Sequence, residues 1–149
     1  KILIKMIYLL KEYIEKDTCD IDKVKEELID LYSQLSICNT ISNDDFLEII
    51  KNNTIFVEVQ NKHIIGAITV LLERKIIHSG KHVAHIEDVV VNKQHRGKQI
   101  GKQLLLWACE YAKQQNCYKV ILNCDDRIRI FYEKCGFKAK NIEMSLYFD

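Results

Sequence analysis

The residues best suited to chemistry lie in one stretch of the chain, between His85 and Glu110. Two carboxylates, Glu87 and Asp88, precede an apolar run that leads through a short polar segment into Arg96-Gly97-Lys98-Gln99-Ile100-Gly101. Helical apolar spacing follows, so the stretch predicts a strand, a glycine-containing turn and a helix. Such a junction directs backbone N–H groups and the positive end of a helix dipole at one place, which suits a phosphate or pyrophosphate.

The spacing of the glycines excludes two common nucleotide-binding motifs. A P-loop needs four residues between its first glycine and a Gly-Lys-Ser/Thr sequence. Gly97 and Gly101 have three residues between them, and Gln103 stands where the hydroxyl residue is required. The G-x-G-x-x-G dinucleotide fingerprint is also absent. The remaining interpretation is a turn that binds a pyrophosphate through backbone amides without a metal.

The first half of the chain predicts the elements that support this turn. Ile7 to Ile14 favours a strand, with a helix as the competing interpretation. Apolar residues at helical spacing predict a helix that begins at Asp20 or Asp22 and continues to about Ser36. Ser42, with Asp45 three residues later, predicts the start of a second, short helix. Two β-rich runs then predict an antiparallel hairpin over Thr54 to Gln60 and Ile64 to Leu72.

The second half predicts alternating strands and helices. A strand from about His82 to Asn92 enters the turn, and a long helix from about Lys98 to Gln115 leaves it, with Trp107 and Tyr111 among its expected buried residues. A short strand follows at Val120 to Leu122. The remaining elements are a helix from Asp125 or Asp126 to Cys135 and one or two closing strands within Phe137 to Phe148. This order predicts an α+β (mixed α/β) sheet layered with helices.

Composition limits the function classes. With 149 residues the chain predicts a single domain over residues 1–149. A formal net charge of +1 gives no reason to expect nucleic acid or an anionic membrane as partner. Ile2 to Leu10, the longest mostly apolar stretch, is too short to span a bilayer and lacks a signal-peptide cleavage site. The six cysteines form no C-x-x-C pair and the five histidines are scattered over predicted turns and strand ends, so we expect reduced thiols, no metal and a cytoplasmic protein.

Several stretches together resemble the GCN5-related N-acetyltransferase (GNAT) family. Arg96 to Gly101 is similar to the acetyl-CoA signature of that family, and the combination with the other stretches is more specific than this signature alone. The resemblance covers nearly the whole chain from about Tyr8. It implies a GNAT fold with a twisted sheet that splays open between strands 4 and 5, helices on both faces and acetyl-CoA in the split. The further matching stretches are Ile86 to Val91, Asn116 to Lys119 and Phe131 to Phe137, with weaker matches at Leu31 to Leu35 and Glu73 to His78.

The resemblance also implies which residues hold the co-substrate acetyl-CoA. The backbone of the apolar strand pairs with the pantetheine and polarises the thioester oxygen, and the amides of the turn hold the pyrophosphate. Gln99 departs from the family pattern, which usually has glycine there, and this affects only the local turn geometry. The implied set is Val89, Val90, Val91, Arg96, Gly97, Lys98, Gln99, Ile100, Gly101, Tyr132 and Lys134.

The catalytic roles follow from the same resemblance. Acetyl transfer to an amine needs a neutral nucleophile, a group that accepts its proton and a group that stabilises the leaving thiolate. Glu87 is the implied base, with Asp88 beside it, and Tyr132 is the implied acid at the thioester sulfur. Alternation along a strand predicts that Glu87 and Asp88 face opposite ways. Asn123 stands where related sequences often have an acidic residue, so an amide is the expected acceptor group there.

Within the family, the wider resemblance implies D-glucosamine 6-phosphate as the amine, N-acetyl-D-glucosamine 6-phosphate as the product, and a step toward UDP-N-acetylglucosamine. The implied acceptor residues are Lys75, His85, Glu87, Asp88, Tyr118, Lys119 and Glu143. Taken alone, the lysines and Glu143 are residue types found more often at a solvated surface than in a site. Leu146 and Tyr147 occupy the region where related sequences carry an arginine that reaches the sugar phosphate across a dimer interface.

The resemblance further implies direct attack in a ternary complex and a homodimer with the C-terminal segments at its interface. Two alternatives stay open. One keeps the fold and changes the acceptor to a protein N-terminus or another small amine. The other is an acyl-CoA-binding sensor without catalysis, against which the presence of both Glu87 and Tyr132 argues.

Overall fold

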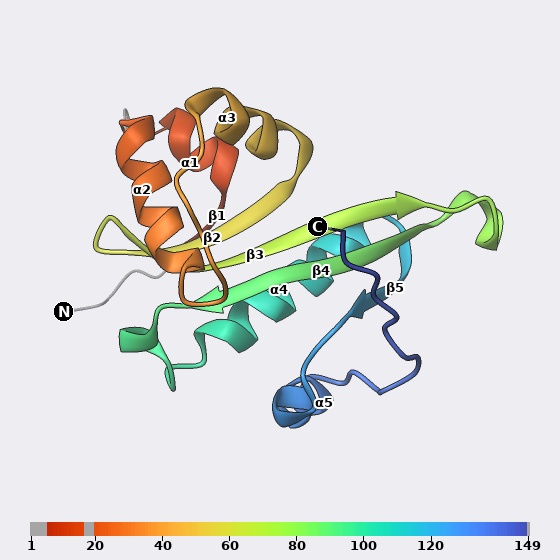
Figure 1. Cartoon of the computed structure of the whole chain (residues 1–149). Helices are drawn as coiled ribbons and strands as arrows, with labels where there is room; N and C mark the ends of the chain where they lie inside the picture. The colour runs from red at the N-terminus through yellow and green to blue at the C-terminus, as the bar shows by residue number, and fades with distance from the viewer. Residues whose placement is uncertain (1–5, 17–19, 149) are drawn as a thin grey trace.

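A five-stranded mixed sheet forms the centre of the molecule in the computed structural model, which describes residues 6–16 and 20–148 (Figure 1). The strands lie in chain order, with β1 to β4 antiparallel and β5 parallel to β4, which confirms the predicted mixed sheet. The strands are β1 (Met6–Leu9), β2 (Thr54–Gln60), β3 (His63–Arg74), β4 (His82–Val91) and β5 (Cys117–Leu122). The helices are α1 (Leu10–Lys16), α2 (Ile21–Tyr32), α3 (Asn43–Asn52), α4 (Ile100–Gln114) and α5 (Arg129–Lys134), with short 3-10 turns η1 (His78–Gly80), η2 (Lys93–His95) and η3 (Asp126–Ile128).

Helices cover both faces of the sheet. Figure 1 shows α1, α2 and α3 grouped on one face and α4 on the other. The alternation of β2 divides its side chains between two buried clusters, with Ile55, Val57 and Val59 facing α2 and Phe56 facing α4. We call these clusters the α2 core and the α4 core. Helices on both faces were predicted, and the structure confirms them.

The N-terminal prediction of one long strand is wrong beyond Leu9. β1 pairs with β2 only over Met6 to Leu9, and α1 begins at Leu10. Leu10 and Tyr13, three positions apart, both enter the α2 core, whereas the residues between them are exposed. This three-residue spacing is helical, so the competing helix interpretation holds from Leu10 onward. The first residues of the apolar stretch Ile2 to Leu10 lie outside the described part.

Side-chain caps fix the starts of the next two helices as the sequence predicted. The Asp20 side chain accepts a hydrogen bond from the Asp22 N–H at 3.0 Å, and the Ser42 hydroxyl accepts one from the Asp45 N–H at 3.1 Å. In α4, the prediction that Trp107 is buried is wrong. Its side chain is 47% exposed and meets the Phe56 ring edge-on, because Leu104, Leu105 and Ala108 fill the α4 core instead.

No closing strand forms in the described tail, contrary to prediction. Residues 137–148 form neither helix nor strand (Figure 1). A strand requires a neighbouring strand for its backbone hydrogen bonds, and the described tail pairs with neither edge of the sheet. The apolar side chains that suggested strands are instead almost fully exposed, between 80% and 89%: Ile142, Met144, Leu146, Tyr147 and Phe148.

A β-bulge in β4 shifts the pattern of side-chain directions next to the predicted catalytic carboxylates. Ala67 pairs with Val90 and Thr69 with Glu87, so two residues of β4 lie opposite one residue of β3. Ala84 and Ile86 pack in the α4 core, yet Val90 packs in the α2 core although regular alternation would place all three on one face. The extra residue lies between Glu87 and Val90, where Asp88 has a left-handed φ of 48°.

No helix in residues 6–16 and 20–148 is long and apolar enough to cross a membrane. Five cysteines in these ranges are free thiols, and Cys19 lies outside them.

Candidate active site

The sheet opens between β4 and β5, as the sequence predicted. The parallel pairing ends at Ile86 and Leu122, while β4 continues to Val91 without a partner on that side in the described chain. Figure 1 shows β5 leading away from β4 toward α5. The opening forms a cleft of about 640 Å³ between β4, the turn before α4, and α5. Its lining residues are Val89, Val91, His95, Arg96, Gly97, Gln99, Ile100, Gly101, Lys102, Ile128, Phe131, Tyr132, Lys134 and Cys135.

The turn before α4, which lines the cleft, has the features of an anion site. α4 begins at Ile100, and its first internal bond joins the Gln103 N–H to the Gln99 carbonyl at 3.0 Å. The three preceding N–H groups are those that a helix leaves for a cap or a ligand, and the Gln99 side chain does not cap them. Gly97 and Gln99 have positive φ values of 78° and 66°, which create the tight turn. The Arg96 Nε donates to the Val91 carbonyl at 3.2 Å and ties the turn to β4.

Most of the predicted acetyl-CoA residues lie around the cleft. Val90 and Lys98 do not line it, since Val90 is buried in the α2 core and Lys98 is exposed outside the lining. Only the backbone of Val90 can therefore serve the predicted role. The sequence prediction missed five lining residues, although three of them, Ile128, Phe131 and Cys135, lie in the helical segment predicted to contain Tyr132. The five are His95, Lys102, Ile128, Phe131 and Cys135.

Tyr132 faces the cleft from α5 with its ring almost entirely buried, 8% exposed. Phe131 and Phe137 pack edge-on against it, with ring centroids at 5.0 Å and 6.1 Å. Burial raises the pKa of the Tyr132 phenol, and the nearby thiols of Cys124 and Cys135 raise it further. The phenol is therefore protonated at neutral pH and can donate a proton or a hydrogen bond.

Glu87 and Asn123 lie where the two strands part. They directly follow the last pair, Ile86 and Leu122, and both are exposed. Thr69, opposite Glu87 on β3, is flanked by Ile68 and Val70 of the α4 core, so Thr69 and Glu87 lie on the α2 face. Asp88 does not face away as predicted, because the bulge breaks the alternation and its charge acts on Tyr32 of α2.

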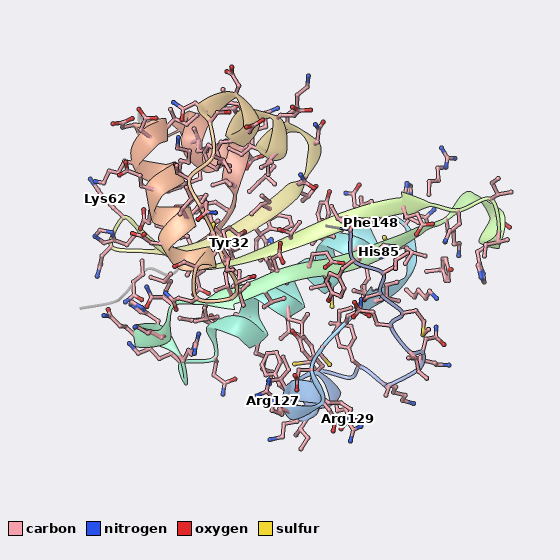
Figure 2. All side chains as sticks on the ribbon, in the orientation of Figure 1. Tyr32, Lys62, His85, Arg127, Arg129 and Phe148 are labelled. Atoms are coloured by element: carbon pink, nitrogen blue, oxygen red, sulfur yellow. The ribbon has the colours of Figure 1, made fainter. Side chains whose placement is uncertain are left out.

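Four predicted acceptor residues gather at the other end of β4, around a residue the prediction did not include. Glu73 accepts from the Lys75 Nζ at 2.5 Å through one oxygen and pairs with the His85 Nε2 at 2.8 Å through the other. The hydrogen bond with Lys75 lowers the pKa of the Glu73 carboxyl most, and the one with His85 lowers it further. The hydrogen bond with Glu73 in turn raises the pKa of Lys75. Figure 2 labels His85 on the sheet. His85 lies two residues before Glu87 on β4.

Tyr118 and Lys119 of β5 complete this group. The Tyr118 ring stacks on His78 with centroids 4.0 Å apart, and the Lys119 Nζ lies 5.6 Å from the Tyr118 ring centroid. His78 was not among the predicted residues, and its stacking depends on the η1 turn, which single-chain periodicity does not show. We call Glu73, Lys75, His78, His85, Tyr118 and Lys119 the basic cluster. Glu143 lies apart in the tail, where it accepts a hydrogen bond from Ser145 at 3.0 Å.

Sequence comparison agrees with this geometry. The family model described as Acetyltransferase (GNAT) family matches residues 21–137, which include α2 and all later elements. The chain belongs to the GNAT family. A relative from Arabidopsis thaliana named glucosamine 6-phosphate N-acetyltransferase is 34% identical over 139 residues, covering 87% of this chain and 93% of the relative.

Solved GNAT structures share the fold over nearly the whole chain. The crystal structure of glucosamine-6-phosphate N-acetyltransferase from Arabidopsis thaliana has a TM-score of 0.84 and 32% identity, covering 98% of this chain and 99% of that one. A Trypanosoma brucei acetyltransferase has a TM-score of 0.85 and 27% identity, covering 97% and 100%. The chain therefore has the GNAT fold. The cleft of this chain lies between β4 and β5. No group of His, Cys, Asp or Glu in the described residues could hold a metal ion.

Proposed function

We propose that the protein transfers the acetyl group of acetyl-CoA to the amine of D-glucosamine 6-phosphate, giving N-acetyl-D-glucosamine 6-phosphate and CoA. The observation that carries this proposal is the opening of the sheet between a carboxylate and a buried phenol. Glu87 lies where β4 and β5 part, and Tyr132 faces the cleft from α5. The relatives named for this reaction support the choice of acceptor.

The cleft matches the chemistry of acetyl-CoA. Arg96, Lys102 and Lys134 line it together with the free N–H groups of α4, so cations and amide donors are available to the pyrophosphate. Val89 and Val91 contribute an apolar wall for the pantetheine. The β4 edge beyond Ile86 has backbone groups with no partner in the described sheet, and a donor there can bond the pantetheine amides and the thioester oxygen.

The proposed reaction is a direct attack. Glu87, directly or through a water, accepts a proton from the substrate ammonium, and the neutral amine attacks the thioester carbon. A backbone N–H of β4 stabilises the negative charge that develops on the carbonyl oxygen. The carbon–sulfur bond then breaks, and the Tyr132 phenol donates its proton to the departing thiolate. No acetyl-enzyme forms in this scheme.

The basic cluster is the proposed site of the sugar phosphate. Lys75 and Lys119 supply two cations, and His85 connects the cluster to Glu87 along β4. Glu73 already neutralises part of the Lys75 charge. A phosphate bound here must therefore compete with Glu73 for Lys75 or rely on Lys119.

We further propose a cytoplasmic homodimer in which the exposed tail packs against the partner subunit. The five apolar side chains of the tail, which are 80% to 89% exposed in the single chain, support this assembly. Each such side chain contributes roughly 1.5–3 kcal/mol when fully buried, so covering the tail is strongly favourable. Free thiols at the five described cysteines are consistent with a reducing compartment.

Acetylation assays with glucosamine 6-phosphate, glucosamine and a peptide with a free N-terminus test the proposal. We expect kcat/KM to be highest for the phosphorylated sugar. Equal values for glucosamine with and without the phosphate would rule out the proposed acceptor, and faster peptide turnover would favour the protein N-terminus. Acetyl-CoA binding without turnover of any amine would favour a sensor.

A further inference from the structure

The β4 bulge next to Glu87 has a strained backbone. Asp88 is not glycine, yet its φ of 48° places it in the left-handed region in the middle of a strand. Such a conformation is unfavourable for a residue with a side chain and persists only where the surroundings hold it in place. Glu87 is the last residue of β4 that pairs with β3 before the bulge and is bonded directly to Asp88, so the bulge fixes one side of the Glu87 backbone.

Two hydroxyls from different elements meet on the α2 face beside this bulge. Thr69, the β3 residue opposite Glu87, is 8% exposed, and its side chain is hydrogen-bonded to the Tyr32 hydroxyl. Tyr32 is the last residue of α2, and Figure 2 shows it where that helix meets the sheet. Burial raises the pKa of Tyr32 to about 12, and the charge of Asp88 adds to this, so the phenol keeps its proton beside the carboxylate.

α2 is fixed to the sheet on both sides of Tyr32 by further polar bonds. The Glu27 carboxylate accepts from the Ile64 N–H at 2.7 Å at the start of β3, and the Gln34 amide oxygen accepts from the Lys93 N–H at 2.9 Å after β4. Tyr32 lies between these two attachments and opposite the bulge. The helix end is therefore held at three points, and the central one, Tyr32, bonds to Thr69, the residue opposite Glu87.

We propose that Tyr32 is a positioning residue of the acetyl transfer, acting through Thr69 to hold the Asp88 bulge and so direct the Glu87 carboxylate at the amine. This inference rests on the proposed function, since it assigns Glu87 as base. Tyr32 itself does not touch the reacting atoms in this scheme. Its loss should therefore slow the chemical step and leave cofactor binding intact.

Steady-state kinetics of Tyr32→Phe and Thr69→Val, each of which removes one hydroxyl, test the proposal. We expect kcat with glucosamine 6-phosphate to fall roughly 3- to 10-fold in each, the factor that corresponds to one lost neutral hydrogen bond. KM for acetyl-CoA should be unchanged, and the double variant should be no worse than either single variant because both break the same link. Thr69→Ser, which keeps the hydroxyl, should restore kcat.

Tyr111→Phe is the matched control, because Tyr111 is half-buried on the α4 side. A lower melting temperature with wild-type kcat in Tyr32→Phe and Thr69→Val would show a purely structural role and overturn the proposal. A rise in KM for acetyl-CoA as large as the expected fall in kcat would overturn the proposal as well.

Amide resonances provide a test that does not depend on the acceptor. In ¹⁵N spectra, the Asp88 and Val89 N–H signals should shift in Tyr32→Phe and Thr69→Val and not in Tyr111→Phe. Unshifted signals would overturn the positioning role. A wild-type protein that turns over no glucosamine 6-phosphate would instead overturn the proposed function, and the same resonances would still decide whether Tyr32 holds the bulge.

Discussion

Glu87 and Tyr132 have contrasting environments that suit opposite proton transfers. Glu87 is exposed at the point where two strands part, which leaves it accessible to an incoming ammonium group. Tyr132 is buried among aromatic rings, and its raised pKa keeps it a proton donor at neutral pH. An acid and a base kept distinct by their surroundings form a common arrangement in catalysis.

Replacing Glu87 with glutamine should lower kcat with little change in acetyl-CoA binding. The amide keeps the size of the side chain and cannot accept the ammonium proton, so a loss of roughly 100-fold is expected for a positioned base. Stopped-flow or steady-state acetylation together with calorimetric titration of acetyl-CoA measures both quantities. Wild-type turnover in this variant would remove Glu87 from the mechanism.

Replacing Tyr132 with phenylalanine should lower kcat by roughly 10- to 100-fold, at or below the low end for general acids, because a thiolate leaves readily without help. The ring still packs against Phe131 and Phe137, so the melting temperature should change little. Phe137→Leu is a suitable control, since it alters packing and keeps the phenol. Full activity in the Tyr132→Phe variant would show that another group protonates the departing thiolate.

At the level of single residues, the sequence suggests candidate residues and does not show their surroundings. The roles proposed for Glu87, Tyr132 and the turn come from a local match and stay predictions. Glu73 and His78 were missed because their importance comes from contacts with His85 and Tyr118, which are distant in sequence. The orientation of Asp88 was wrong because a one-residue bulge leaves no mark in the hydrophobic pattern.

Among the elements, the turn before α4 combines the proposed anion site with backbone strain. Gln99, just before α4, has a φ of 66°, a left-handed conformation that glycine adopts without a steric penalty. Gln99→Gly should therefore raise the free energy of unfolding by about 1 kcal/mol, less the entropy that glycine adds to the unfolded chain. Thermal unfolding measures this change, and KM for acetyl-CoA should stay the same because the backbone N–H is kept. Gln103→Gly, within the helix, should destabilise instead.

The start of the α5 segment depends on one charged cap. Asp125 accepts from the Arg127 N–H at 2.9 Å and from the Arg127 guanidinium at 2.9 Å and 3.0 Å, and these bonds lower its pKa to about 2. A carboxyl whose folded pKa lies below the usual value of about 3.9 stabilises the fold above that value. This contribution is then lost as the pH falls from about 4 toward 2.

Comparing wild type with Asp125→Asn in denaturant at several pH values tests this cap. The variant should be less stable at pH 6, and the difference should shrink as the pH falls toward 2. Asp126→Asn is the control, because Asp126 pairs with Arg129 and does not cap the turn. A difference that is constant across this range would show that the Asp125 charge does not matter.

The sequence predicted the interior elements well because caps and periodicity are local. It failed at the N-terminal segment, where β-favouring residues and helical spacing compete and the pairing of β1 with β2 decides the outcome. It failed again in the tail, since a strand pattern specifies a strand only when a partner strand is present. Both failures concern interactions between segments far apart in the chain.

At the scale of the whole molecule, the tail is the segment whose apolar side chains the described chain leaves exposed. Ile142, Met144, Leu146 and Phe148 alternate with other residues, the pattern of a strand with one apolar face, yet all four are exposed. β5, the outermost strand, is only partly buried, so it also lacks a cover on its free side. A second subunit can supply the missing neighbour for both.

Leu146→Asp should therefore weaken the proposed homodimer, because it places a charge in the middle of the apolar face that the partner would cover. Light scattering after size exclusion should give twice the 17.5 kDa chain mass for wild type and a shift toward the monomer for the variant. Ser145→Asp adds the same charge on the other side of the alternation and should leave the dimer intact. Equal masses for all three proteins at micromolar concentration would place the tail outside the interface, and a monomeric wild type would contradict the dimer itself.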